Sequence, residues 1–297
     1  MTGQNSDPLV VSIGLQKGGV GKTTFAINLA ERLAALGNRT CFVDLDQQGN
    51  ATEGVGHKDA MTTDRNLNAA LRDDEDVSVR DVIRTVDCEN TFDLIPAHKD
   101  FNELENWLDD HTWGQLQIRN QVVDELSDDY DAIVIDTPPN LGLMSDSGHI
   151  ASQAVVVPLL MSAFSEAGFE RMFLEQIVEI DREIGCDIYA IVPNKLSGDN
   201  EEKRIINDME DSPFGQYLPE FCRSKQFDRS DSPGPGIRKN IGLKRSIRDG
   251  VPLADYDPEN PMIERFEELA RIVETGGLGG PVSEVVDELL ETRETTA

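Results

Sequence analysis

The sequence predicts an α/β domain whose doubly wound, mostly parallel sheet is covered by helices on both faces. Short apolar runs rich in Val and Ile alternate along the chain with longer segments of helical periodicity. Turn residues bound each apolar run, and 297 residues are enough for one large domain with a well-buried core. Strands that alternate with helices are typical of a parallel sheet with two covered faces.

The expected elements follow in chain order. Apolar runs predict buried strands at 9–15, 40–45, 133–135, 154–157 and 188–192. Helical periodicity predicts helices at 24–36, 164–184 and 262–274, and the first and last of these end at glycine. We expect one domain over 1–275 with an insertion-like region at about 57–128, of which 57–90 is polar and acidic. A glycine-rich hinge and an acidic C-terminal helix follow over 276–297.

The composition is strongly acidic. Asp and Glu number 56 against 27 Lys and Arg, which gives a formal net charge of −29 at pH 7. The acidic residues are spread along the chain, so an acidic binding tail is not expected. An ordinary acidic cytosolic protein and a halophilic one both fit. The scarcity of aromatic residues and lysine favours the halophilic alternative, in which a dense acidic surface stays hydrated and screened.

The chain has the features of a cytoplasmic protein. No run approaches the roughly 20 apolar residues that span a bilayer, and residues 1–8 lack a signal-peptide pattern. The four cysteines, Cys41, Cys88, Cys186 and Cys222, are too widely spaced to form a metal or redox pair. Cys41 and Cys186 are expected in the core, and a reducing compartment is consistent with all four.

A glycine-rich loop between the first strand and the first helix predicts a phosphate-binding loop (P-loop) for ATP. Backbone N–H groups here can cradle phosphate oxygens at the positive end of the helix, and glycine permits positive φ angles and close approach. Lys22 is expected to reach the β- and γ-phosphates, and Thr23 to hold Mg²⁺. The nucleotide-binding residues of this loop are predicted to be Lys17, Gly18, Gly19, Val20, Gly21, Lys22, Thr23 and Thr24.

Residues 17–24 resemble the signature of the deviant Walker A ATPases, the ParA/Soj/MinD family of P-loop NTPases. The general P-loop pattern begins with glycine where this chain has Gln16, and Lys17 follows directly. In that family the extra lysine reaches across a dimer to the phosphates of the partner's ATP. The resemblance therefore implies catalytic roles for Lys17 and Lys22 and a homodimer that forms on ATP binding. A chance glycine-rich turn is disfavoured, because eight consecutive residues match in a strand–loop–helix context.

Two further segments resemble motifs of the family. Residues 43–52 resemble its second motif, with Gln47 in place of the usual proline. This implies that Asp44 positions or activates the attacking water near Mg²⁺, whereas a turn-capping role is the structural alternative. Residues 130–139 resemble the Walker B strand and its Pro-Pro switch, which implies that Asp136 binds Mg²⁺ directly or through water. The expected metal-site residues are thus Thr23, Asp44 and Asp136.

The resemblance extends to an adenine-binding side and covers roughly residues 10–272, with 57–128 the weakest part. Asn194 lies at a predicted strand end where the family uses Asn to bind the adenine edge, although it could also be a turn residue. Residues 237–252 resemble the late adenine-side loop, which adds Ile237 and Arg238 to the nucleotide-binding residues. Arg238 replaces the usual proline there, and Lys239 the usual arginine.

A basic segment stands out against the acidic chain. Residues 223–248 hold eight basic residues, opposed within the segment by Asp228 and Asp231. An anionic partner explains such an excess, and nucleotide binding or intramolecular ion pairs are the alternatives. The expected DNA-binding residues are Arg223, Lys225, Lys239, Lys244, Arg245 and Arg248.

The basic segment together with the resemblance favours a ParA-like partition ATPase that binds DNA non-specifically. The resemblance implies that a centromere-binding partner of ParB type stimulates it and that it associates with the nucleoid. The C-terminal helix is expected to place an acidic face opposite an apolar stripe that includes Val282 and Val285, which is unsuited to an anionic membrane. A MinD-like or other cargo-positioning ATPase that acts through protein partners is the alternative.

Overall fold

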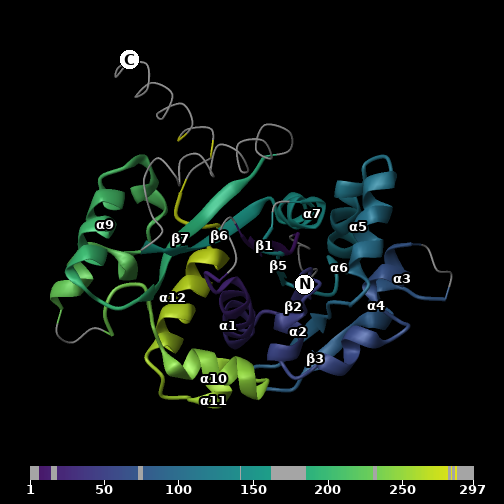
Figure 1. Ribbon diagram of the computed structural model, residues 1–297, viewed down its shortest axis with the longest axis horizontal. Helices are drawn as coiled ribbons and strands as arrows, with labels where there is room; N and C mark the ends of the chain where they lie inside the picture. The colour runs from purple at the N-terminus through teal and green to yellow at the C-terminus, as the bar shows by residue number, and fades with distance from the viewer. Residues whose placement is uncertain are drawn as a thin grey trace, which may run out of the picture.

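A central eight-stranded sheet organises the computed structural model of the protein. The structure describes residues 7–14, 19–72, 76–140, 142–161, 185–229 and 233–279, together with Val282 and Val285. Within this part of the chain the strand order is β3-β4-β2-β5-β1-β6-β7-β8 (Figure 1). The strands are β1 (Leu9–Ile13), β2 (Thr40–Asp44), β3 (Arg84–Val86), β4 (Phe92–Ile95), β5 (Ala132–Asp136), β6 (Ala154–Leu160), β7 (Asp187–Leu196) and β8 (Ile237–Arg238).

The described helices include eleven α-helices and several single turns. The α-helices are α1 (Lys22–Ala35), α2 (Asn50–Gly54), α3 (Leu67–Leu71), α4 (Val79–Val82), α5 (Phe101–Asp110), α6 (Asp124–Leu126), α7 (Leu143–Ser152), α9 (Asn200–Glu210), α10 (Ile241–Asp249), α11 (Leu253–Tyr256) and α12 (Met262–Glu274). The short 3-10 turns are η1 (Lys58–Thr62), η2 (Gly114–Leu116), η5 (Pro213–Tyr217), η6 (Glu220–Cys222) and η7 (Ser224–Asp228), and η3 (Arg119–Val123) is a π-helical turn.

Strand direction and burial confirm the predicted fold class. Every described strand pair is parallel except β3–β4, which is antiparallel. Strand β5 shows that both faces of the sheet are covered, because its successive side chains point to opposite faces and pack in two different hydrophobic cores. Val134 packs in the core beneath α1 and α12, whereas Ile133 and Ile135 pack in the core beneath α3, α5 and α7. Figure 1 shows α1 and α12 on one side of the sheet and α5 and α7 on the other.

The register of the central strands defines one functional edge. Asp136, the last residue of β5, pairs with Ile13 at the end of β1 and with Asp44 at the end of β2. Parallel strands present their carboxyl ends at the same edge of a sheet, where ligands bind in open α/β folds. The segments after β1, β2 and β5 therefore begin side by side.

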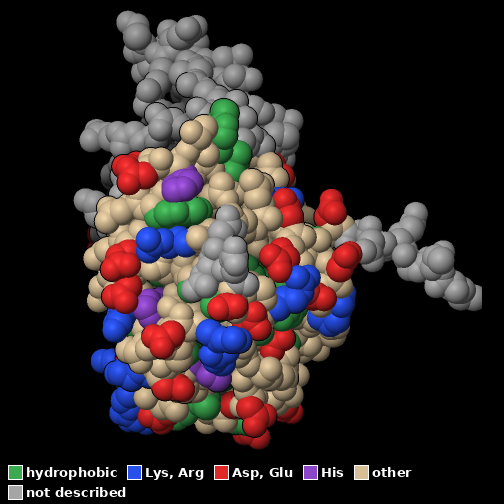
Figure 2. Space-filling view, turned by 90° about the vertical axis from the view of Figure 1, so that its right-hand side faces the viewer, with side chains coloured by type: hydrophobic (Ala, Val, Ile, Leu, Met, Phe, Trp, Pro, Cys, Tyr) green, Lys and Arg blue, Asp and Glu red, His purple; other side chains and the backbone are tan. Residues whose placement is uncertain are grey.

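The region expected to be insertion-like is integrated into the sheet. Residues 57–128 contribute β3 and β4, and helices α3, α4 and α5 of the same region pack in the core that contains Ile133 and Ile135. The sequence did not reveal β3 because Arg84 and Thr85 are polar residues on an edge strand. The face formed around α3, α4 and α5 intersperses acidic and basic side chains (Figure 2), consistent with ion pairs such as Arg80–Glu125 and Arg72–Glu103.

The remaining expectations are met in part. Helix α12 has the predicted bounds, whereas β7 continues four residues beyond the predicted strand end. The predicted helix at 164–184 lies outside the described residues. Cys41 and Cys186 are buried, as expected. Val282 and Val285 are fully buried in the core that also contains Val134. Among the described residues, no helix is long and apolar enough to cross a membrane.

Candidate active site

The described part of the P-loop lies between β1 and α1. Lys17 and Gly18 lie outside the described residues. Gly19 and Gly21 have φ angles of 91° and 97°, so both positions need the conformational freedom of glycine. A Cβ at Gly21 would also lie 2.8 Å from the Asn194 side-chain nitrogen. Gly21 is the N-cap of α1, so the predicted strand–loop–helix context is present.

Lys22 and Thr23 open α1 beside the end of β5. Lys22 is 7% exposed, and burial lowers the pKa of its ammonium, whereas the carboxylates of Asp136 and Asp46 raise it. Asp136 is 1% exposed, and no described atom meets hydrogen-bond geometry with either of its carboxylate oxygens. Thr23 is nevertheless close enough to lower the pKa of Asp136. The structure thus brings three predicted site residues to one point.

Asp44 completes this cluster from the neighbouring strand. It is fully buried, and its carboxylate accepts hydrogen bonds from Asp46 N (3.1 Å), Thr52 N (2.8 Å) and Thr52 Oγ1 (2.7 Å). Burial raises the pKa of Asp44 to about 7 despite these bonds. Burial and the nearby Asp44 charge raise the pKa of Asp136 well above its ordinary value. Two carboxylates in this arrangement disfavour joint ionisation unless a cation joins them.

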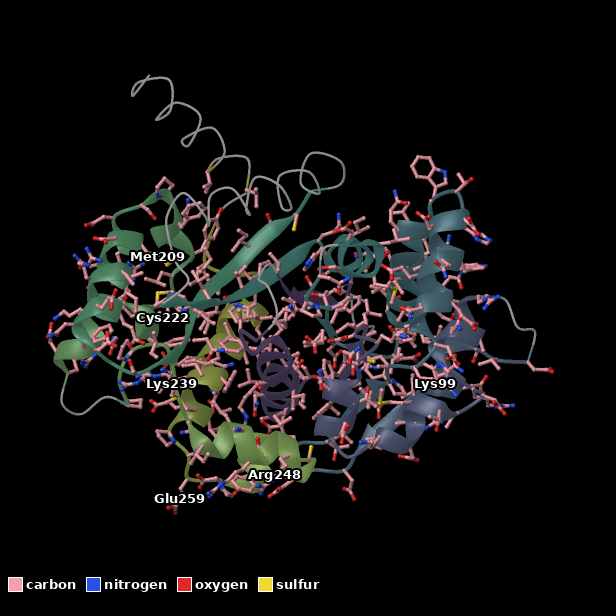
Figure 3. The ribbon with its side chains drawn as sticks, viewed as in Figure 1. Lys99, Met209, Cys222, Lys239, Arg248 and Glu259 are labelled. Carbon is pink, nitrogen blue, oxygen red and sulfur yellow. The ribbon has the colours of Figure 1, made fainter. Side chains whose placement is uncertain are left out.

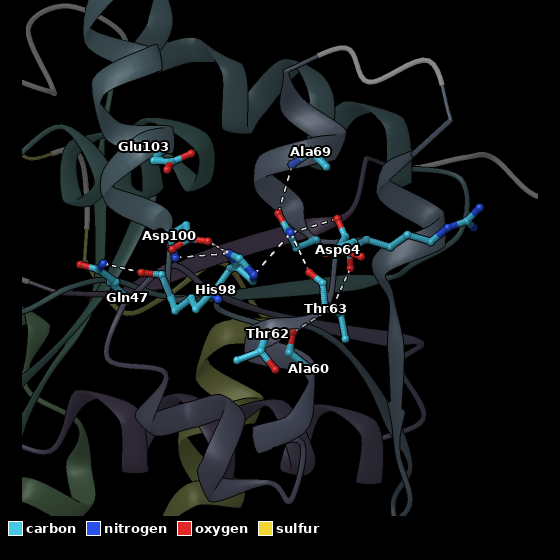
Figure 4. Close-up of polar contacts among 12 residues, drawn as sticks. Gln47, Ala60, Thr62, Thr63, Asp64, Ala69, His98, Asp100 and Glu103 are labelled. Carbon is cyan, nitrogen blue, oxygen red and sulfur yellow. Dashed lines mark hydrogen bonds and ion pairs between the residues drawn. The ribbon is translucent and has the colours of Figure 1, made fainter.

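The loop after β4 supports the Asp44 loop. Gln47 donates from Nε2 to the Lys99 carbonyl oxygen at 2.6 Å, and the buried His98 ring lies between Asn66 and Asp100 (Figure 4). The sequence showed only that Gln47 replaces the family's proline. Where the family has proline, this chain thus has a glutamine whose side chain donates a hydrogen bond to the loop after β4.

The predicted adenine-side residues have roles within the protein itself. The Asn194 side chain is 5% exposed and donates to the Val20 carbonyl oxygen at 2.6 Å. Ile237 pairs with Asn194 across β7 and β8, and its side chain is fully buried. The Arg238 guanidinium donates to the carbonyl oxygens of Leu196 and Ser197. Nucleotide contacts by these residues stay a prediction.

Sequence reasoning missed a buried histidine directly behind the P-loop. His149 of α7 is fully buried, its Nδ1 lies 2.9 Å from Ser12 Oγ of β1, and Ser152 Oγ lies 2.9 Å from the same hydroxyl. A Cβ on Gly14 would lie 2.0 Å from the imidazole. Burial, and secondly the Lys22 charge, lower the pKa of His149 to about 4. The sequence held no clear signal for this contact, because α7 has weak periodicity.

Comparison with known proteins decides the family. Residues 9–189 match the family model described as an AAA domain. The chain is 30% identical to the sporulation initiation inhibitor protein Soj of Bacillus subtilis, over 90% of this chain and 99% of Soj. It is 34% identical to the chromosome partitioning protein ParA of Myxococcus xanthus, over 88% of this chain and 86% of ParA. The chain belongs to the ParA/Soj/MinD family.

Solved structures of low sequence identity share the fold of this ParA/Soj/MinD-family ATPase. McdA of Cyanothece, determined as an ATP complex, has a TM-score of 0.71 at 20% identity, covering 91% of this chain and 96% of McdA. The cell division ATPase MinD of Pyrococcus furiosus has a TM-score of 0.65 at 21% identity, covering 90% of this chain and 98% of MinD. Both likenesses support the α/β architecture.

Lys22→Ala is expected to weaken ATP binding by about a hundredfold, because a charge-assisted contact to the phosphates is lost. Isothermal calorimetry measures the effect. Lys58→Ala removes a lysine whose side chain is 71% exposed and serves as the control with parent affinity. Equal ATP affinity in the Lys22 variant and the parent would contradict the P-loop assignment.

Acid should destabilise the protein through His149. An unfolded histidine has a pKa near 6.5, whereas the folded pKa is about 4. As the pH falls through this window, the unfolded chain gains a proton that the folded state excludes, so the free energy of unfolding decreases. The loss should reach about 3 kcal/mol, from about 1.4 kcal/mol per pKa unit. His149→Gln lacks this titration.

Urea denaturation of the parent and the His149→Gln variant between pH 7 and pH 4.5 measures the difference. Other titrating groups are common to both proteins and cancel. The gap between their unfolding free energies should shift steadily in favour of the variant as the pH falls. A gap that does not change with pH would refute the assignment.

Proposed function

We propose that this chain is a ParA-type partition ATPase, which hydrolyses ATP with Mg²⁺, dimerises on ATP and binds DNA non-specifically. The observation that carries the proposal is the meeting of Lys22, Thr23 and the paired carboxylates at one sheet edge. Near full-length similarity to Soj and ParA supports it. A centromere-binding partner of ParB type, a nucleoid-associated cytoplasmic location and adaptation to high salt belong to the same proposal.

The Asp136 environment fits a bound Mg²⁺. Both carboxylate oxygens of Asp136 are buried and accept no hydrogen bond of standard geometry from the described residues, which matches the preference of this cation for oxygen ligands. Asp136 and the Thr23 hydroxyl would hold the ion, which supplies positive charge to the phosphates when bound. Lys22 adds a second positive charge from the P-loop.

Asp44 retains the capacity to orient the attacking water. A carboxylate offers about four acceptor sites, and three are used by Asp46 N and by Thr52. The remaining one can accept a hydrogen bond from the attacking water, which would let Asp44 take its proton as a general base. The bonds to Thr52 fix the direction of the carboxylate. Lys17 of the partner copy would then complete each site across the dimer.

The structure divides the basic segment into two groups. Arg223 and Lys225 lie on the turns beside α9 and both pair with Glu220. The second group lies on or next to α10, where Arg248 pairs with Asp249 at 2.9 Å. Figure 3 labels Lys239 and Arg248, the two ends of this group. Part of the local positive charge is therefore neutralised within the protein.

Three basic residues on or next to α10 stay available for a partner. Lys239, Lys244 and Arg245 are exposed, and within the described ranges none of them forms an ion pair or hydrogen bond. Ile241, the first residue of α10, is also 62% exposed. Phosphate contacts by exposed lysine and arginine supply most of the affinity in non-specific DNA binding. We therefore centre the proposed DNA surface on α10.

A cargo-positioning ATPase that acts through proteins is the second candidate, favoured by the fold shared with MinD. DNA binding separates the two candidates. The double variant Lys244→Glu, Arg245→Glu is expected to abolish ATP-dependent DNA retardation while ATP affinity stays at the parent value. Single substitutions that remove the charge at either position should reduce the slope of log affinity against log salt, relative to the parent, by roughly 0.9 per lost phosphate contact.

The matched control is Arg65→Glu with Arg72→Glu, which makes the same charge change near α3. It should retard DNA as the parent does at equal salt. Normal retardation by the α10 double variant would remove α10 as the DNA surface. A parent that never retards DNA with ATP would favour the protein-cargo candidate.

A further inference from the structure

Two side chains at the end of β7 hold consecutive carbonyl groups of the P-loop. Asn194 Nδ2 donates to Val20 O at 2.6 Å, and the Lys195 ammonium donates to Gly19 O. More than 170 residues separate the partners in sequence. The family resemblance gives Asn194 an adenine contact and assigns nothing to Lys195.

Peptide geometry turns these contacts into a constraint on the P-loop N–H groups. A trans peptide is planar, and its C=O points opposite to the N–H of the next residue. No cis peptide occurs among the described residues. Holding Gly19 O and Val20 O against β7 therefore directs the N–H groups of Val20 and Gly21 away from β7. Both belong to the N–H groups expected to bind phosphate.

The backbone on both sides is shaped for this contact. Lys195 has a φ of 55°, an uncommon left-handed conformation for a residue with a side chain. The Asn194 side-chain oxygen accepts a hydrogen bond from Lys195 N at 2.7 Å, which supports that turn. On the other side, only glycine fits at position 21, because a Cβ would meet Asn194. Lys195 is otherwise exposed, so burial does not explain where its ammonium lies.

We propose that Lys195, together with Asn194, is a positioning residue that clasps the P-loop and aims its N–H groups at the nucleotide phosphates. The inference rests on the proposed ATPase function and adds a residue to it. It is compatible with an adenine contact by Asn194, because a side-chain amide carries two hydrogens and the clasp uses one. A substitution of Lys195 therefore tests the clasp without altering an adenine contact by Asn194.

The test compares Lys195→Met with the parent, using ATP, ADP and inorganic tripolyphosphate as probes in calorimetry. Loss of one positioning bond should weaken all three by a similar factor of about ten. KM for ATP should rise with little change in kcat, because phosphate contacts are made in both ground and transition states. Lys195→Arg keeps a donor and should bind within about twofold of the parent.

Two controls separate positioning from folding. Lys203→Met removes another lysine, on α9, which pairs with Asp228, and should bind all probes normally. Thermal unfolding of Lys195→Met without nucleotide should match the parent, since the side chain is exposed. A lower unfolding temperature with unchanged kinetics would indicate a structural role and overturn the clasp.

The remaining outcomes are also decisive. Unchanged affinity of Lys195→Met for all probes overturns the clasp and leaves the proposed ATPase in place. Weaker binding of ATP and ADP with normal tripolyphosphate binding would assign Lys195 to the base instead. A parent that binds none of the three probes refutes the proposed function, and the clasp with it.

Discussion

The buried pair of Asp44 and Asp136 is the main electrostatic constraint on the candidate site. The two residues pair in register at the ends of adjacent parallel strands, and both are almost inaccessible to solvent. Burial raises the pKa of both carboxyl groups, the Asp46 charge adds to the rise at Asp44, and the Asp44 charge adds to the rise at Asp136. The Lys22 charge partly offsets the free-energy cost of ionising Asp136 in the interior. Burial lowers the pKa of Lys22 itself, and the carboxylates of Asp136 and Asp46 partly restore it. A bound cation relieves the repulsion that remains.

Several elements hold this edge of the sheet in place. Thr52 Oγ1 donates to Asp44 and accepts a hydrogen bond from Ala97 N at 2.9 Å, which connects the site to the loop after β4. Thr137 Oγ1 donates to Ile13 O at 2.8 Å and joins the segments after β5 and β1. Helix α7 packs so closely on Thr137 that a Cβ at Gly148 would lie 2.7 Å from the Thr137 methyl group, so glycine is needed at this position. The P-loop therefore rests on a layer that also orients the carboxylates.

Sequence patterns predicted the parallel core and the position of Lys22, Thr23, Asp44 and Asp136, because contiguous motifs and apolar strands encode them. They did not predict β3 and β4, because both strands are short and the edge strand β3 carries the polar residues Arg84 and Thr85. Contacts between distant segments, such as His149 with Ser12 or Lys195 with Gly19, leave no local pattern. Three-dimensional proximity also showed that acidic neighbours neutralise part of the basic segment, which counting charges within it had missed.

The dependence of thermal stability on Mg²⁺ in the Asp136→Asn variant tests whether the buried carboxylate pair is a cation site. Unfolding temperature is measured at fixed ATP while Mg²⁺ is varied, for the parent and the variant. If the buried pair is a cation site, Mg²⁺ raises the unfolding temperature of the parent with ATP, through preferential binding to the folded state. The variant should respond to ATP but show no further rise with Mg²⁺. The same Mg²⁺-dependent rise in both proteins would show that Asp136 does not hold the cation.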